Sequence, residues 1–317
     1  PESDASARPT ATPRARGYAR PMAEREIACP APLDLRRTLA HARLEGPVTE
    51  ASDSSAWIAG HAPDGPLSMR IDIVAARIRA EAWGPGADWM LARLPEVVGA
   101  HDDPTALVPR HDVVRRAARR HPGLRMPAIA LVYDSLVPTI LGQRVSGLEA
   151  ARGLRELIWR FGSPAPGPGD ARILPAPSEL AGMSYAQLHP CGIERSRART
   201  LIAAARETIR VQEAFERSAD EGARRLAAIR GIGPWTVALV RTATQGDPDL
   251  VPHGDHNLPH LVSWALAGER RGDDARMDAL LAPYAGQRGR VLRLLQAVGA
   301  GPPRRAPRAA ARDFSRH

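Results

Sequence analysis

Residues 226–240, which read LAAIRGIGPWTVALV, decide the fold of this chain. Apolar residues at helical spacing are interrupted by Gly231 and Gly233, and Pro234 suits the first turn of a second helix. The pattern predicts a helix-hairpin-helix. Glycines let a backbone approach a phosphate closely, and the unpaired N–H groups where a helix begins form an anion site. An ordinary structural turn between two helices is the alternative, because glycine followed by proline is common there.

The charge balance around this motif favours a polyanionic partner. The chain has 317 residues, with 44 Lys+Arg, 35 Asp+Glu and a formal net charge of +9. None of the 44 is a lysine, so every fixed cation is a guanidinium, which pairs with phosphate in a bidentate way. Chemistry that needs a lysine amine is therefore excluded. Codon bias combined with basic tails would explain the same composition without a ligand.

The composition also indicates the class of protein. At roughly 100 to 200 residues per domain, the length predicts two domains with tails, and no apolar run approaches the ~18 residues of a membrane span. The cysteines, Cys29 and Cys191, are too few for a disulfide framework or a four-cysteine cluster. The first residues show no apolar signal core. We therefore expect a soluble protein in the cytoplasm, associated with the nucleoid.

Four segments follow from the local pattern. Residues 1–26 and 301–317 contain few large apolar side chains and are predicted to be disordered tails, the second of them basic. Residues 27–104 show strand-like alternation at 56–61 and 67–83 before a helical stretch, which predicts a small α/β domain. Residues 105–300 are predicted to be helical. The expected fold class is α+β, mostly α-helical.

Within the helical segment, one long helix is predicted from about Pro138 to Phe161, with Pro138 in its first turn. The Pro- and Gly-rich residues 163–180 are predicted to form a loop. Further helices are predicted at 178–184, 196–209, 224–229, 234–244, 258–267 and 287–298.

The hairpin and its surroundings resemble the helix-hairpin-helix (HhH-GPD) DNA glycosylase superfamily, and within it the 3-methyladenine DNA glycosylase II, or AlkA-like, type. In that family, Gly-x-Gly-x-Trp-Thr is followed about twenty residues later by an aspartate in a Pro-x-Asp context. Asp255 lies at that distance from Trp235, in the stretch VPHGD of residues 251–255. Residues 139–146, TILGQRVS, resemble the I-L-G-Q-x-V-S helix of the family, and residues 188–201 add support. The resemblance covers about residues 105–300, and implies a helical glycosylase domain preceded by a sheet-containing domain.

The resemblance implies that Asp255 is catalytic. Cleavage of a base–sugar bond builds positive charge on the sugar, which a nearby carboxylate stabilises, and the carboxylate can also deprotonate water. Capping of the helix that begins near Leu258 is the structural alternative, and Asn257 competes for that role. Relatives that also cut the DNA strand use a lysine to form a Schiff base, and the position of that lysine appears in this sequence as Trp235. A monofunctional enzyme without lyase activity is therefore implied.

The resemblance also assigns DNA contacts. A flipped base leaves a gap in the duplex, and the family's wedge residue follows the Gln of the I-L-G-Q helix, a position that Arg144 occupies here. Gln143 is expected to contact the same gap or to bond local backbone, and a plain surface role is the alternative for Arg144. The hairpin residues expected to bind phosphate are Gly231, Gly233, Pro234 and Thr236.

The substrate pocket is expected to include Trp235, whose ring could hold an electron-poor base by stacking, although core packing explains it equally well. Two further pocket positions of the family, occupied there by Tyr and Trp, fall on Leu239 and Arg293. An arginine would repel a cationic alkylated base. These departures therefore leave open the alternative that the substrate is a neutral lesion.

The histidines near Asp255, at positions 253, 256 and 260, raise the possibility of a zinc site. Pro259 and the lack of an H-E-x-x-H glutamate argue against it, and no metal is expected there. The resemblance implies at most a monovalent cation at the hairpin.

The sequence therefore predicts a monomeric, monofunctional DNA glycosylase of base excision repair that flips a damaged base, expected to be an alkylated purine, from double-stranded DNA. Two alternatives stay open: a glycosylase for a deaminated, oxidised or bulky base, and a non-catalytic binder of damaged DNA.

Overall fold

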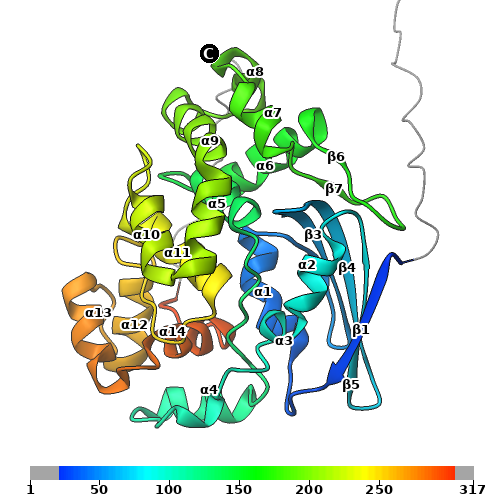
Figure 1. Ribbon diagram of the computed structural model, residues 1–317. Coiled ribbons are helices and arrows are strands. Elements are labelled where there is room, and N and C mark those ends of the chain that lie inside the picture. The colour runs from blue at the N-terminus through cyan, green and yellow to red at the C-terminus, as the bar shows by residue number, and fades with distance from the viewer. Residues whose placement is uncertain (1–20, 304–317) are drawn as a thin grey trace, which may run out of the picture.

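The computed structural model describes residues 21–303, so the predicted C-terminal tail lies almost wholly outside them. An antiparallel sheet comes first in the chain and a larger assembly of helices follows, with α1 (Leu35–Glu45) lying between the two (Figure 1). The α+β prediction is confirmed. Within residues 21–303, no helix is long and apolar enough to cross a membrane.

Five strands form the main sheet, in the order β1-β5-β4-β3-β2: β1 (Ala23–Ala28), β2 (Val48–Ala51), β3 (Ser55–Ala62), β4 (Gly65–Val74) and β5 (Arg77–Trp83). The single strand-like stretch 67–83 is two strands, because Ala75 and Ala76 both have positive φ and close a two-residue hairpin. The N-terminal tail boundary at residue 26 is also wrong. Ala23 already pairs with Ala82, so the sheet begins inside the expected tail.

One face of the sheet is buried under helices. Ile58, Met69 and Ile71 pack with Leu35 and Leu39 of α1, all of them fully buried. Helix α1 begins where Asp34 accepts a hydrogen bond from Arg37 N, a cap that the sequence reasoning missed. The helical stretch predicted after the sheet is two short helices, α2 (Ala87–Ala92) and α3 (Leu94–Val97).

The remaining elements are mostly helical and match most of the predicted ranges. The predicted loop 163–180 carries a two-stranded hairpin, β6 (Ser163–Pro164) and β7 (Arg172–Ile173). The helices are α4 (Asp112–Arg120), α5 (Val132–Leu141), α6 (Gly147–Phe161), α7 (Pro177–Gly182), α8 (Tyr185–Leu188), α9 (Arg195–Arg217), α10 (Ala219–Ala227), α11 (Pro234–Gln245), α12 (Leu258–Ala267), α13 (Asp274–Leu281) and α14 (Arg288–Ala297). Short 3-10 turns lie at Pro104–Ala106, His189–Cys191 and Ala282–Tyr284.

The long helix predicted from Pro138 is wrong, because the chain breaks it into α5 and α6. Pro138 lies inside α5, which begins at Val132. Ser146 starts α6 with a capping box, its side chain accepting from Glu149 N while the Glu149 carboxylate accepts from Ser146 N. The Ser-x-x-Glu pattern was visible in the sequence and marks a helix start. The break places residues 142–146 in a partly buried loop, in which Arg144 is exposed.

The helices share two hydrophobic clusters. One is formed mainly by α5, α9 and the two hairpin helices, and includes Ile232 and Val240. The other joins α4 to α12, α13 and α14, and includes Val251 and Leu258. Residues 241–257 therefore link one cluster to the other, and Asp255 lies at their junction.

Candidate active site at the junction of two helical clusters

The predicted helix-hairpin-helix is present as α10, a tight turn and α11. Leu226, Ile229 and Ile232 are buried and hold the turn against the core. Gly231 has φ +92°, and a Cβ there would lie 2.1 Å from Thr200 Oγ1, so only glycine fits. Around Gly233, by contrast, an added Cβ would meet nothing within 4 Å. The first glycine therefore serves packing, while the second leaves the start of α11 open to a ligand.

Gln143 ties the end of α5 to this hairpin. Its Nε2 donates to Gly231 O and to Thr236 Oγ1, each at 3.0 Å. Buried Arg197 of α9 also donates to Leu141 O at 2.9 Å, which fixes the same helix end. The structure thus gives Gln143 and Thr236 a role in positioning the hairpin, and their predicted contacts with DNA stay predictions.

Arg144 occupies the loop that follows. It is exposed and has φ +58°, a left-handed conformation that costs a non-glycine residue on the order of 1–3 kcal/mol. Its neighbours on both sides are held, by Gln143 at the hairpin and by the capping box of α6. The loop therefore presents Arg144 to solvent from a rigid base, as the wedge prediction requires.

Asp255 faces the hairpin. Its Oδ2 accepts a hydrogen bond from Trp235 Nε1 at 3.0 Å, and its Oδ1 accepts from the backbone N–H groups of Asn257 at 2.7 Å and Leu258 at 3.0 Å. Oδ1 thus bonds backbone N–H groups at the start of α12, although the N-cap position belongs to Asn257, which makes no side-chain cap hydrogen bond. This structural role does not exclude catalysis. All three donors are neutral, and within the part of the chain that the structure describes no cation is paired with the carboxylate.

The loop that carries Asp255 is anchored by α13, a helix that the sequence reasoning did not predict. Gly254 N donates to Asp274 Oδ2 at 2.8 Å, and His253 Nε2 lies 2.9 Å from Asp278 Oδ1. The signal was available, since Asp273 caps the helix by accepting from Arg276 N. Asp274 and Asp278 are thus supporting residues of the site.

The pocket residues fall into two groups. Trp235 lies beside Asp255 and packs near the end of α5, where a Cβ at Gly142 would be 3.8 Å from its ring; Leu239 is buried one turn further along α11. Arg293 is engaged elsewhere. Its Nη2 donates to Arg37 O and Thr38 O of α1, and burial is the main cause that lowers its pKa to about 10. The structure therefore gives Arg293 a structural role, and its predicted place in the pocket stays a prediction.

Metal ligation at the histidines has no support from the geometry. His260 Nδ1 accepts from Gly272 N at 3.2 Å, and the rings of His256 and His260 contact each other edge to face. In the part of the chain that the structure describes, no three His, Cys, Asp or Glu side chains are grouped to hold a metal ion. At the hairpin, the carbonyls of Ile229 and Gly231 each accept one hydrogen bond and keep a second lone pair, so they fit the monovalent cation that the resemblance implies.

Three comparisons bear on this geometry. No protein-family model matches the chain. Among curated proteins, it is similar to the probable bifunctional transcriptional activator/DNA repair enzyme AlkA of Mycobacterium tuberculosis, with 26% identity over 196 residues. The match covers 60% of this chain and 38% of that relative, so the chain corresponds to only part of it.

Solved structures share the fold. The 3-methyladenine DNA glycosylase of Archaeoglobus fulgidus superposes with a TM-score of 0.67 at 18% identity, covering 86% of this chain and 97% of the other. The 8-oxoguanine glycosylase/lyase of Clostridium acetobutylicum, in complex with double-stranded DNA, gives a TM-score of 0.57 at 10% identity, with 78% and 95% covered. The chain therefore shares the fold of these DNA glycosylases and is similar in sequence to part of AlkA.

Proposed function

We propose that this protein is a monofunctional DNA glycosylase of base excision repair, which flips a damaged base from duplex DNA and hydrolyses its N-glycosidic bond. The observation that carries the proposal is the Asp255 carboxylate, which is held by Trp235 and the start of α12 and has no cationic partner among residues 21–303. A carboxylate oriented by neutral dipoles stabilises the positive charge of an oxocarbenium-like transition state, because its own charge is not already neutralised.

DNA is the proposed partner of the surface around this carboxylate. The hairpin would hold a phosphate at the start of α11, where the space around Gly233 is open. Arg144, exposed on its rigid loop, would enter the gap that the flipped nucleotide leaves; unpairing and unstacking cost a few kcal/mol. We further propose that the protein acts as a monomer on nucleoid DNA in the cytoplasm.

The composition supports the proposed absence of lyase activity. A Schiff-base mechanism needs an amine nucleophile, and the sequence contains no lysine. The fold by itself decides nothing here, since the Clostridium acetobutylicum protein is a glycosylase/lyase. We therefore expect an intact abasic strand as the product, without a protein–DNA adduct after borohydride treatment.

An alkylated purine is the proposed substrate. The positive charge of Arg293 would repel a cationic base in the pocket, but its guanidinium is buried and directed at carbonyls of α1. Trp235 offers a half-buried ring beside Asp255, and such a ring attracts a cationic base by roughly 0.5–2 kcal/mol.

The test is base release from duplex DNA treated with a methylating agent, with the freed bases resolved by chromatography. Wild type should release methylated purines, and Asp255→Asn should release none above background. Release by the variant at the wild-type rate would remove Asp255 from the mechanism. Binding to an abasic duplex without release of any base, in a panel that includes deaminated and oxidised lesions, would favour a binding protein.

The wedge assignment has its own test. Arg144→Ala should slow single-turnover excision from duplex DNA by about tenfold, while excision of the same lesion from single-stranded DNA, which needs no gap filling, should change little. Equal rates for variant and wild type on the duplex would contradict the wedge role.

A further inference from the structure

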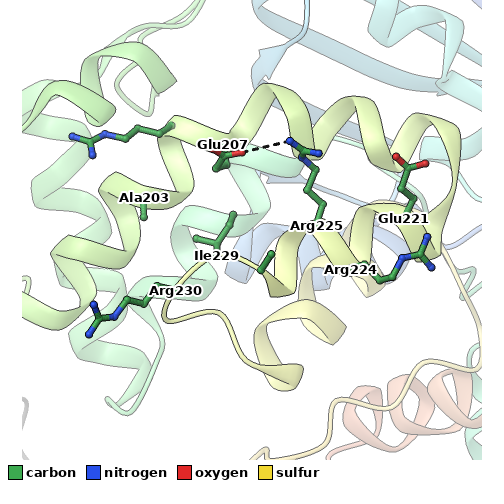
Figure 2. A pocket seen from close by; sticks show the side chains of 9 residues that line it. Ala203, Glu207, Glu221, Arg224, Arg225, Ile229 and Arg230 are labelled. Carbon is green, nitrogen blue, oxygen red and sulfur yellow. Dashed lines mark ion pairs between the residues drawn. The ribbon is translucent and has the colours of Figure 1, made fainter.

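A second feature of the helical domain is an open groove of about 710 Å³ between α9 and α10 (Figure 2). Ala203, Ala228 and Ile229 contribute its apolar lining, and the other six lining residues are charged: Arg206, Glu207, Glu221, Arg224, Arg225 and Arg230. Within residues 21–303, none of these nine residues forms a hydrogen bond or ion pair with Asp255 or Trp235. The groove is therefore a feature separate from the candidate active site.

The two carboxylates of the groove are already compensated. Glu207 lies 3.8 Å from Arg225 Nη2 and 3.4 Å from Arg210 Nη1, and the first of these pairs spans the groove in Figure 2. Glu221 Oε1 lies 2.6 Å from Arg217 Nη2 on the preceding turn. This hydrogen bond is the largest cause that lowers the pKa of Glu221.

The groove, in contrast, is lined by more arginines than carboxylates. Among the described residues, Arg206 donates to a backbone carbonyl, that of Ala181, and forms no ion pair. Arg224 and Arg230 form no ion pair within the described part of the chain. The groove thus presents net positive charge, and these guanidinium groups are available to an anion, with which they can bond in a bidentate way.

The groove leads to the hairpin. Arg230 directly precedes Gly231 in the turn, and Glu221 and Arg224 lie at the opposite end, toward the start of α10 (Figure 2). A phosphate bound at the start of α11 would therefore have arginines beside it along α10. A strand of DNA carries one phosphate per ~3.4 Å of helix axis, so it matches a row of cations better than a single small anion does.

We propose that this groove binds the phosphate backbone of one DNA strand beyond the hairpin, with Arg224 and Arg230 each neutralising one phosphate. The proposal rests on the proposed function for its ligand, and adds a second segment of DNA contact beside the hairpin that does not involve Asp255. The contacts would be independent of base sequence, and would add affinity without taking part in bond cleavage.

Fluorescence anisotropy with a duplex that contains a stable abasic analogue tests the groove, with binding constants measured over a series of salt concentrations. For Arg224→Gln/Arg230→Gln, the slope of log K against log[salt] should become less steep by about 2, since each phosphate contact contributes about 0.9. The control is Arg77→Gln/Arg79→Gln on β5, which removes the same charge at half-exposed positions of the sheet. It should keep the wild-type slope.

A second arm locates the contact. Shortening the duplex step by step on one side of the abasic analogue should abolish the difference between wild type and the groove variant, and shortening the other side should not. A groove variant with the wild-type slope, or a control variant with the same loss, would overturn the proposal.

The outcomes separate this proposal from the proposed function. A reduced slope in the groove variant, in a protein that releases no base from any lesion, would support the groove and sink the glycosylase assignment. Base release with an unchanged slope would sink the groove alone. An acidic peptide that competes with DNA only in the wild type and control would show that the groove binds polyanions without selectivity for nucleic acid, contradicting the assignment to DNA.

Discussion

Two aspartates of this protein are held in opposite ways. Asp255 receives three hydrogen bonds, from one indole and two backbone N–H groups, and has no cationic partner in the described structure. Asp102 lies between the sheet domain and α14. Its side chain is 6% exposed, forms an ion pair with buried Arg290 and accepts a hydrogen bond from Met126 N. The charge of the Asp255 carboxylate remains available to a ligand, whereas that of the Asp102 carboxylate is neutralised by Arg290 within the fold.

The two aspartates show that the same carboxylate group can serve the fold or a reaction, depending on whether its hydrogen-bond donors are charged or neutral. A buried ion pair stabilises a fold only while both partners are present, because either one alone is an uncompensated charge in a medium of low polarity. A carboxylate held by neutral dipoles retains its field toward an open side. The surroundings of an aspartate, rather than its burial alone, therefore separate a catalytic candidate from a structural one.

The largest effect expected from this comparison is on turnover at Asp255. Asp255→Asn should lower base release by about 10³-fold or more, because the amide is neutral and supplies no field to the transition state. Unfolding free energy should fall by only about 1 kcal/mol, since one amide hydrogen now faces a donor. Single-turnover rates and urea denaturation of the same preparation measure both quantities, and a loss of folding as large as the loss of rate would undo the comparison.

Asp102→Asn should give the reverse result. Removing the carboxylate leaves the Arg290 guanidinium buried without its partner, so the unfolding free energy should fall by about 3–5 kcal/mol. The excision rate per folded molecule should stay near that of wild type. Denaturation midpoints together with active-site titration separate the two, and unchanged stability would show that this pair contributes nothing to the interface.

The same interface should make the protein sensitive to acid through His41 of α1. Burial, with a smaller contribution from the charge of Arg293, lowers the pKa of His41 to about 3. The unfolded chain takes up this proton near pH 6.5 and the folded one does not, so stability is lost as the pH falls from 6.5 toward 3. The loss reaches about 2 kcal/mol at pH 5.

The readout for this pH effect is the slope of unfolding free energy against pH, and not the unfolding free energy at one pH. His41→Gln should flatten the decline between pH 6.5 and 5 by about one proton, even if the variant is less stable at pH 7. His101→Gln, at a side chain that is 72% exposed, should leave the slope as it is. If both variants decline like wild type, His41 is not the group that titrates.

The smallest predicted effect sharpens the description of Asp255. Trp235→Phe keeps an aromatic ring beside the carboxylate but removes the indole N–H that donates to Oδ2. The excision rate should fall by about tenfold, which corresponds to one hydrogen bond of about 1.4 kcal/mol. Affinity for an abasic duplex should not change. A greater loss of binding than of rate would assign the ring to DNA contact and not to orientation of Asp255.

Much of this arrangement was predictable because its signals are local. The Gly-x-Gly-Pro turn predicted the hairpin, and α12 begins and ends at the predicted residues. The prediction failed at α5 and α6, where an apolar stripe was extended through Val145 and Leu148 even though Ser146 and Glu149 form a capping box. Leu148 is 51% exposed, so apolar periodicity alone was a misleading guide there. The C-terminal tail and the domain limits other than residue 26 stay predictions.

The sequence by itself determined the local backbone choices and the chemistry that is excluded: a glycine-containing turn at residues 231–233, a helix that begins at Pro234, and no lysine for a Schiff base. Only the tertiary structure decided which side chains meet. It brought Trp235 to Asp255, bound Gln143 to the hairpin and turned Arg293 toward α1. The physical reason is that helix starts and turns depend on neighbouring residues, whereas the partners of a side chain depend on how distant segments pack, which local pattern does not encode.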